Sequence, residues 1–183
     1  MSRAALLATS LGAHFLLLAG TVWSILRPDL RLWPPPGRRS WQFAATWLLF
    51  AAATASYVWL GVADWNPLGL SPWLRLPAGG LLLAAGLTLS LWGVLSLGVG
   101  QAMGLEGDLR VSGPYRYTRN PQYLGDIAAT LGWVVLTGSP RVAAVGLAAS
   151  VWYAVLPRSE EPWLEERFGD AYRRYRDRVP RFL

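Results

Sequence analysis

The sequence predicts an all-α, polytopic membrane protein with about five transmembrane helices, and three observations support this. First, 53% of the 183 residues are apolar and only 15% are charged, whereas about a quarter of the residues in ordinary soluble domains are charged. Second, the apolar residues gather in long runs that carry no Asp, Glu or Arg. Third, the arginines lie between these runs, a pattern typical of membrane topology. The length is that of one domain.

The first three apolar runs are each long enough to form a membrane-spanning helix. They cover Ala4–Leu26, Phe43–Ala63 and Ala78–Val99. At about 1.5 Å per helical residue, each run is at least as long as the ~30 Å hydrocarbon core of a bilayer. We therefore expect three full crossings in the first part of the chain.

Two shorter apolar runs follow and predict a helical hairpin. They are Tyr123–Thr137 and Val142–Leu156, and the turn Gly138-Ser139-Pro140-Arg141 separates them. Gly and Pro in this position are typical of a tight connection. Each run would be roughly 20–25 Å long as a helix, so a re-entrant hairpin that does not fully cross is the alternative to two short spans.

The arginine distribution predicts the orientation of the five spans. Arg27–Gln42, Gly100–Gln122 and Pro157–Leu183 carry four, three and seven arginines, and these segments share one side if there are five crossings. The other side receives Arg3, Arg75 and Arg141. The positive-inside rule then places the N-terminus outside and the C-terminus in the cytosol. This placement explains the net charge of +6 without a nucleic-acid partner, and we expect none.

The residue types that are scarce exclude several classes of site. The chain has no Cys, its 17 basic residues are all Arg, and His14 is its only histidine. Thiolate nucleophiles, Schiff-base lysines and multi-histidine metal sites are therefore excluded. We expect no metal.

The loop before the hairpin, Leu109–Gly125, has features of an anion-binding site. Its arginines alternate with tyrosines (Tyr115 and Tyr123 among them), which is also typical of an aromatic belt at the membrane interface. An interfacial belt does not explain the sequence Arg119-Asn120-Pro121, which resembles a helix N-cap followed by Pro at the first helical position. Free backbone N–H groups at such a helix start favour a carboxylate or a phosphate.

The C-terminal segment Pro157–Leu183 predicts an amphipathic helix on the cytosolic face, with a pair of carboxylates at its start. Glu160 and Glu161 directly follow a hydrophobic run, where two adjacent carboxylates are costly without a nearby cation. Arg158 or a positively charged ligand would supply that cation. An anion site, a carboxylate pair and many aromatic rings on one face fit a zwitterionic sulfonium cofactor such as S-adenosylmethionine.

Several ordered motifs then resemble a known group of enzymes. They are G-P-Y-x-x-x-R-N-P-x-Y-x-G from Gly113 to Gly125, E-E-x-x-L from Glu160, F-G-x-x-Y-x-x-Y from Phe168 and V-P-R-F from Val179. These motifs resemble the integral-membrane methyltransferase superfamily, which includes the isoprenylcysteine carboxyl methyltransferases and the phospholipid methyltransferases. The resemblance covers roughly the last 75 residues. It divides the single domain into a three-helix membrane part, residues 1–99, and a cofactor-binding and catalytic part, residues 100–183.

The resemblance implies a set of functional residues for this chain. Many relatives have His where Asn120 stands, so an acid–base role at this position is not expected. The cofactor-binding residues would be Gly98, Gly100, Gly113, Tyr115, Arg119, Asn120, Pro121, Tyr123, Glu160 and Glu161. For Gly98 and Gly100 the alternative is a simple helix end. The catalytic residues would be Glu160, Glu161 and Arg119. Asp126 is a further catalytic candidate for a different reason, because it is an ionisable residue one turn into the fourth apolar run. The alternative is that it only pairs with Arg119 or Arg116.

The expected function is S-adenosylmethionine-dependent methyl transfer to a membrane-embedded amphiphile, either a lipid amine or an isoprenoid/cysteine-type carboxylate. One alternative is a membrane scaffold or lipid-binding protein without enzymatic activity. Another is an NADPH-dependent enzyme similar to the steroid reductases, which share an R-x-P-x-Y loop. We expect the acceptor to enter sideways from the membrane. Gly86, Gly125 and Gly132 either leave room for its chain or allow close helix packing.

Overall fold

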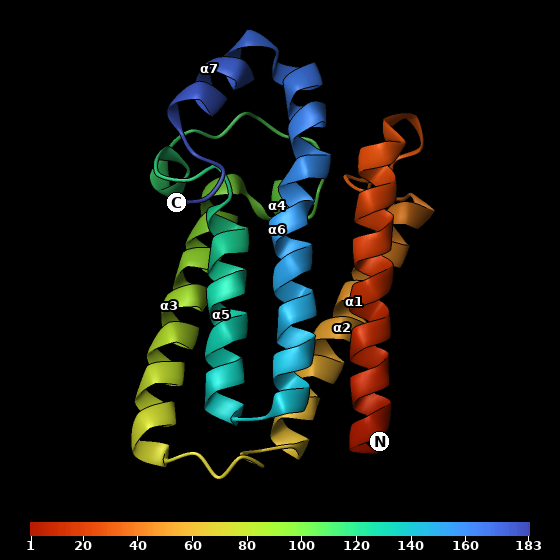
Figure 1. Cartoon of the computed structure of the whole chain (residues 1–183). Coiled ribbons are helices and arrows are strands. Elements are labelled where there is room, and N and C mark those ends of the chain that lie inside the picture. The colour runs from red at the N-terminus through yellow and green to blue at the C-terminus, as the bar shows by residue number, and fades with distance from the viewer.

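The computed structural model of the protein describes all 183 residues, and it is helical throughout, without strands. Five long helices form the bundle: α1 (Arg3–Leu26), α2 (Trp41–Ala63), α3 (Pro72–Leu97), α5 (Pro121–Thr137) and α6 (Pro140–Phe168). Short helices lie in the connections and at the end: η1 (Pro28–Leu30), α4 (Val99–Ala102), η2 (Gly113–Arg116) and α7 (Asp170–Arg178). Figure 1 shows the N-terminus at one end of the bundle and the C-terminus near the other. The predicted all-α fold is confirmed.

Local sequence signals set the ends of the helices. The side chains of Ser2, Ser40 and Ser139 each accept a hydrogen bond from a backbone N–H in the first turn of α1, α2 and α6, respectively. Gly138 ends α5 in the left-handed conformation, with φ of 51°. Such a residue satisfies carbonyl groups at a helix end at low steric cost when it is glycine. The hairpin of α5 and α6 therefore turns where Gly138 and Ser139 predict it.

Two predicted helix boundaries were wrong, and both helices continue through prolines. The third helix begins at Pro72 rather than Ala78, with proline at its first position, and continues through Pro77. The helix expected to end at Leu156 continues through Pro157 and Pro162 to Phe168. The carboxylate pair consequently lies on the same rigid helix as the apolar run and not in a separate cytosolic segment.

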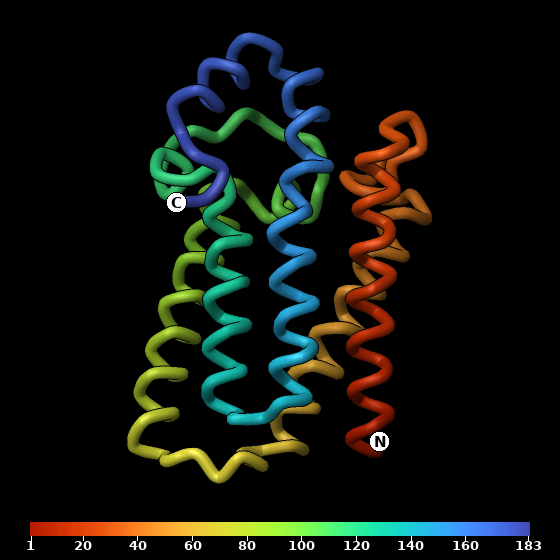
Figure 2. Tube along the Cα trace, viewed as in Figure 1, coloured from red at the N-terminus to blue at the C-terminus, as the bar shows by residue number.

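Four helices, α1, α2, α3 and α6, are long and apolar enough to cross a membrane. The fifth, α5, has 17 residues and a length of about 25 Å. It runs beside α3 and α6 (Figure 2). The count of five crossings and the orientation of the termini stay predictions.

Glycines bring α3 and α5 into backbone contact along most of the length of α5. A Cβ atom on Gly79 would lie 2.7 Å from the backbone N of Leu136, and one on Gly93 would lie 2.9 Å from the backbone N of Gln122. Between these two points, Gly86 and Gly132 also face the backbone of the opposite helix. Small residues at this spacing permit close helix approach in membranes. Helix packing therefore accounts for these glycines, and the alternative that they leave room for an acceptor chain was wrong.

Candidate functional site

A pocket at one end of the bundle collects most of the polar residues singled out from the sequence. It lies where α3 and the apolar part of α6 end and α5 begins, and α7 folds back over this region (Figure 1). The loop after η1 and the loop before α5 contribute to its wall together with α6 and α7. Its lining includes Pro34, Leu97, Gln101, Ala102, Leu105, Asp108, Arg110, Tyr115, Arg119, Asn120, Gln122, Tyr123, Glu160, Glu161, Trp163, Leu164, Tyr172 and Tyr175.

The C-terminal tail fixes the start of α5 at the edge of the pocket. The backbone N–H of Arg119 donates to the carbonyl of Pro180 over 2.9 Å, and the side-chain amide of Asn120 donates to the carbonyl of Arg181 over 3.0 Å. Asn120 is the residue before Pro121 at the first helical position, as predicted, but its side chain caps no N–H of α5. Its amide nitrogen donates to the tail instead, because the carbonyl of Arg181 is within reach.

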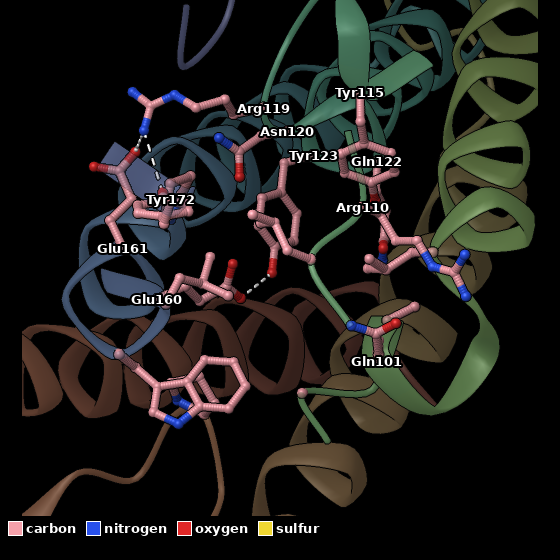
Figure 3. Close-up of a pocket in the computed structure, with 18 of the residues that line it drawn as sticks. Gln101, Arg110, Tyr115, Arg119, Asn120, Gln122, Tyr123, Glu160, Glu161 and Tyr172 are labelled. Carbon is pink, nitrogen blue, oxygen red and sulfur yellow. Dashed lines mark hydrogen bonds and ion pairs between the residues drawn. The ribbon is translucent and has the colours of Figure 1, made fainter. Parts of the chain in front are cut away.

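Glu161 is held between two guanidinium groups. Its carboxylate accepts hydrogen bonds of 2.8 and 2.7 Å from Arg181 and lies 2.9 Å from Nη1 of Arg119. Arg119 also donates to the hydroxyl of Tyr172 over 3.2 Å, and Figure 3 shows Arg119, Glu161 and Tyr172 on one side of the pocket. Burial raises the pKa of Tyr172 to about 12, so its phenol is neutral at physiological pH. The hydrogen bonds to Glu161 raise the pKa of Arg181 above its usual value.

Glu160 has a different environment, although it is the next residue. Its Oε1 accepts a hydrogen bond of 2.6 Å from the indole of Trp33 and a second one from the hydroxyl of Tyr123. Both donors are neutral, so no cation within the protein offsets the charge of this carboxylate. Arg158, the cation suggested by the sequence, is exposed and forms no ion pair with either glutamate. Burial and neutral donors leave Glu160 suited to a positively charged ligand.

The donors and charges of the pocket favour a small zwitterion with net positive charge. Nε of Arg119 is buried and has no hydrogen-bond partner, so a donor for a ligand carboxylate remains beside the pocket. The lining carries three carboxylates, Asp108, Glu160 and Glu161, against two guanidinium groups, Arg110 and Arg119. S-adenosylmethionine combines a carboxylate with an ammonium and a sulfonium group, and these residues fit that combination.

Two further tyrosines shape the wall between α7 and η2. The hydroxyl of Tyr175 donates to the carbonyl of Tyr115 over 2.7 Å, and both side chains are buried. Tyr172 and Tyr175 are the buried residues of α7. They are three residues apart in the F-G-x-x-Y-x-x-Y motif, and this spacing places both on the one face of α7 that packs on the site. The predicted amphipathic helix therefore packs on the pocket.

Some of the residues predicted for the site lie elsewhere. Gly98 ends α3 with φ of 96° and Gly100 lies in α4, so the Gly-x-Gly sequence forms a helix end. Asp126 faces a separate cavity and accepts a hydrogen bond of 2.6 Å from Ser90; it forms no ion pair with Arg116 or Arg119. Gly98, Gly100, Gly113, Pro121 and Asp126 do not line the pocket, whereas Tyr115, Arg119, Asn120, Tyr123, Glu160 and Glu161 do.

The sequence analysis missed three residues that organise the site. Trp33 reaches Glu160 across 127 positions of sequence, and nothing around it in the proline-rich first loop indicates that contact. Tyr172 and Arg181 lie in motifs that the sequence already presented. The excess of arginines near the C-terminus was the available signal that Glu161 has partners there.

Comparison with known proteins assigns the chain to a family. The profile of the family described as "Phospholipid methyltransferase" matches residues 74–171, more than half of the chain and all of α5 and α6. Steroid 5-alpha-reductase DET2 of Solanum lycopersicum is 33% identical over 117 residues, which cover 61% of this chain and 43% of that protein. The chain thus spans less than half the length of this curated relative. No solved structure matches significantly. The chain is a membrane protein of the phospholipid methyltransferase family, within the integral-membrane methyltransferase superfamily.

Proposed function

We propose that the protein transfers a methyl group from S-adenosylmethionine to an amphiphilic acceptor dissolved in the membrane, at the cytosolic end of the bundle. The observation that carries this proposal is the unpaired carboxylate of Glu160 in a pocket with more carboxylates than arginines. The family match supports methyl transfer. In this proposal residues 100–183 supply the cofactor-binding and catalytic part, and Trp33 completes the site from the first 99 residues.

The residues of the pocket take distinct roles. Arg119 holds the cofactor carboxylate through its free Nε, and Glu161 positions Arg119. Glu160 neutralises the positive end of the cofactor, and Tyr123 and Trp33 hold Glu160 in place. When bound, S-adenosylmethionine supplies an electrophilic methyl group that forms a bond to the acceptor while the C–S bond breaks and its electron pair stays on sulfur. Such a displacement depends on alignment and water exclusion more than on acid–base groups.

Methyl transfer is tested directly with radiolabelled S-adenosylmethionine and purified protein in vesicles made from a bacterial lipid extract. Label is expected in the organic phase, in a species about 14 mass units heavier than its precursor, because CH₃ replaces H. The Glu160→Gln variant, which keeps the size of the side chain, is the matched control. Equal labelling by this variant would remove Glu160 from the proposal. A complete absence of label from every lipid class would contradict the proposed function.

A second candidate is the reductase activity named for the tomato relative, which is 33% identical over part of the chain. A nicotinamide dinucleotide phosphate carries several negative charges, which the excess of carboxylates in the pocket disfavours. Oxidation of NADPH by the protein in the presence of a steroid enone would establish this alternative. A non-enzymatic scaffold would show neither activity.

A further inference from the structure

A second cavity adjoins the proposed cofactor pocket and holds the carboxylate of Asp126. This chamber, as we call it, has a volume of about 40 Å³, which is room for a small polar head but not for a chain. Gln122, Tyr123 and Ala102 line both the chamber and the cofactor pocket. The ring of Tyr123, which bonds to Glu160 on one side, therefore forms part of the chamber wall on the other.

Most of the chamber lining is aromatic, and Asp126 is its only ionised group. Aromatic rings from the first loop, α2, α5 and α6 contact one another around it, with centroid separations of 5.0 Å for Trp152 and Tyr153 and 5.3 Å for Trp47 and Phe50. Its aromatic lining is Trp33, Trp47, Phe50, Tyr123, Trp152 and Tyr153. Ser90 donates to one oxygen of Asp126, and no arginine pairs with it. A carboxylate without a cation, enclosed by π faces in a membrane helix, is suited to a cationic group.

An apolar groove between α1 and α2 adjoins the chamber. It has a volume of about 380 Å³ and shares Trp33, Thr46, Trp152 and Leu156 with the chamber. Leu16, Trp23 and Trp41 form its rim and are exposed on the surface of the apolar helices. The groove floor is built from small or apolar side chains, namely Leu17, Ala19, Gly20, Ala45 and Leu49.

We propose that the groove between α1 and α2 holds the hydrocarbon chain of the acceptor and that the chamber holds its positively charged amine head beside Asp126. This inference rests on the proposed methyl transfer and names the acceptor class and its route. The acceptor enters from the lipid between α1 and α2. Its ammonium gives a proton to the carboxylate of Asp126, and the lone pair left on nitrogen forms the new N–C bond as the electron pair of the C–S bond remains on sulfur.

The test is photolabelling of the protein in phosphatidylglycerol nanodiscs with hexadecylamine that carries a diazirine in mid-chain. Mass spectrometry is expected to find the label on residues 16–23 and 41–49. Asp126→Asn keeps the shape of the side chain and an acceptor for Ser90, so the fold should persist while labelling falls roughly 10-fold with the loss of the charge. Hexadecanoic acid with the same diazirine should not label the groove.

Two further variants separate groove occupancy from folding. Ala45→Phe fills the groove and should reduce labelling, whereas Ala44→Phe, on the exposed face of the same helix turn, should not. Label spread over the lipid-facing side of α3, equal labelling by the acid, or unchanged labelling of Asp126→Asn would overturn the inference. Thermal stabilisation by S-adenosylhomocysteine is measured on each variant in parallel. If it is present in all of them, a failure of labelling counts against this inference alone; if it is absent from the unmodified protein, the proposed function itself fails.

Discussion

At the scale of single residues, two adjacent glutamates have opposite surroundings and therefore different consequences when changed. Glu161 is paired with Arg119 and Arg181, and Glu160 with the neutral donors Trp33 and Tyr123. Residues one apart on a helix face different directions, which is how one carboxylate stabilises the tail while its neighbour remains open to a ligand. In the proposed function, Glu161 is therefore a positioning residue and Glu160 is the residue that contacts the ligand.

The first prediction follows from this division. Glu160→Gln should weaken binding of S-adenosylhomocysteine in isothermal titration calorimetry by roughly 10- to 150-fold, the value of a charge-assisted hydrogen bond of about 1.5–3 kcal/mol. Its melting temperature should stay near that of the unmodified protein. Glu161→Gln should instead lower the melting temperature, because it leaves the largely buried Arg119 without its counter-charge. Equal dissociation constants for the unmodified protein and Glu160→Gln would remove Glu160 from the site.

The sequence predicted the polar residues of the site better than their partners. Arg119, Tyr123, Glu160 and Glu161 were identifiable because charged or aromatic groups stand where an apolar run begins or ends. Trp33 was not, since its contact with Glu160 depends on how α1 and α6 pack. The role of Asn120 was missed for a similar reason. Its sequence neighbours predict a helix cap, whereas its side-chain amide donates to the carbonyl of Arg181 in the distant tail.

At the scale of helices, glycines decide which pairs of helices approach closely. Gly86 on α3 faces the backbone of α5, whereas Gly80 on the same helix has no atom within 4 Å of a Cβ position. The apolar runs predicted the helices themselves, but hydropathy carries no information about which faces meet. The sequence therefore could not decide whether the glycines of α3 and α5 serve close helix packing or leave room for an acceptor chain.

The second prediction compares these two glycines. Gly86→Leu should lower the melting temperature and the yield of monodisperse protein, with a cost of about 1–3 kcal/mol or more for overpacking. Gly80→Leu adds the same side chain in open space and should behave like the unmodified protein. Size-exclusion profiles and thermal melts in detergent check both variants. Similar behaviour of the two would show that α3 and α5 do not meet through Gly86.

A buried ion cluster joins three helices at the end of the bundle far from the pocket. Asp64, at the end of α2, is fully buried and accepts hydrogen bonds from Ser139 and Arg141 at the start of α6, and Arg3 of α1 lies 3.5 Å away. The hydrogen bond from Ser139 and the nearby arginines hold the pKa of Asp64 below its usual value. Because the cluster around Asp64 lies at the opposite end of the bundle from the pocket, its role is structural.

The third prediction is a pH-dependent stability effect. Because the pKa of Asp64 is lowered in the folded protein, its stabilisation is fully present above the unfolded value of about 3.9 and is lost as pH falls through the folded value. Asp64→Asn should therefore lower the melting temperature at pH 7, by an amount equivalent to about 1–3 kcal/mol, and the difference should shrink below about pH 4. Affinity for S-adenosylhomocysteine at pH 7 should not change. A difference in melting temperature that is constant from pH 7 to pH 3 would contradict this account.

At the scale of the whole molecule, the fold places polar chemistry at one end of an apolar bundle. Composition and the arginine distribution predicted this division, since long uncharged runs and charged connections separate along the chain. The structure adds that the first loop, the start of α5, α6 and the tail converge on one pocket, and that a lipid-facing groove lies next to it. Which segments meet at the pocket depends on which helices pack side by side, and a single sequence does not reveal this.

The measurement that tests the central claim most directly is thermal stabilisation of the purified protein by S-adenosylhomocysteine, with NADP⁺ as the comparison. A ligand that binds the folded state at about 100 times its dissociation constant adds about 2.7 kcal/mol of stability. We predict a rise in melting temperature with S-adenosylhomocysteine that saturates, that is strongly reduced in Glu160→Gln, and that NADP⁺ does not reproduce. Stabilisation by NADP⁺ and not by S-adenosylhomocysteine would contradict the assignment of this pocket to a methyl donor.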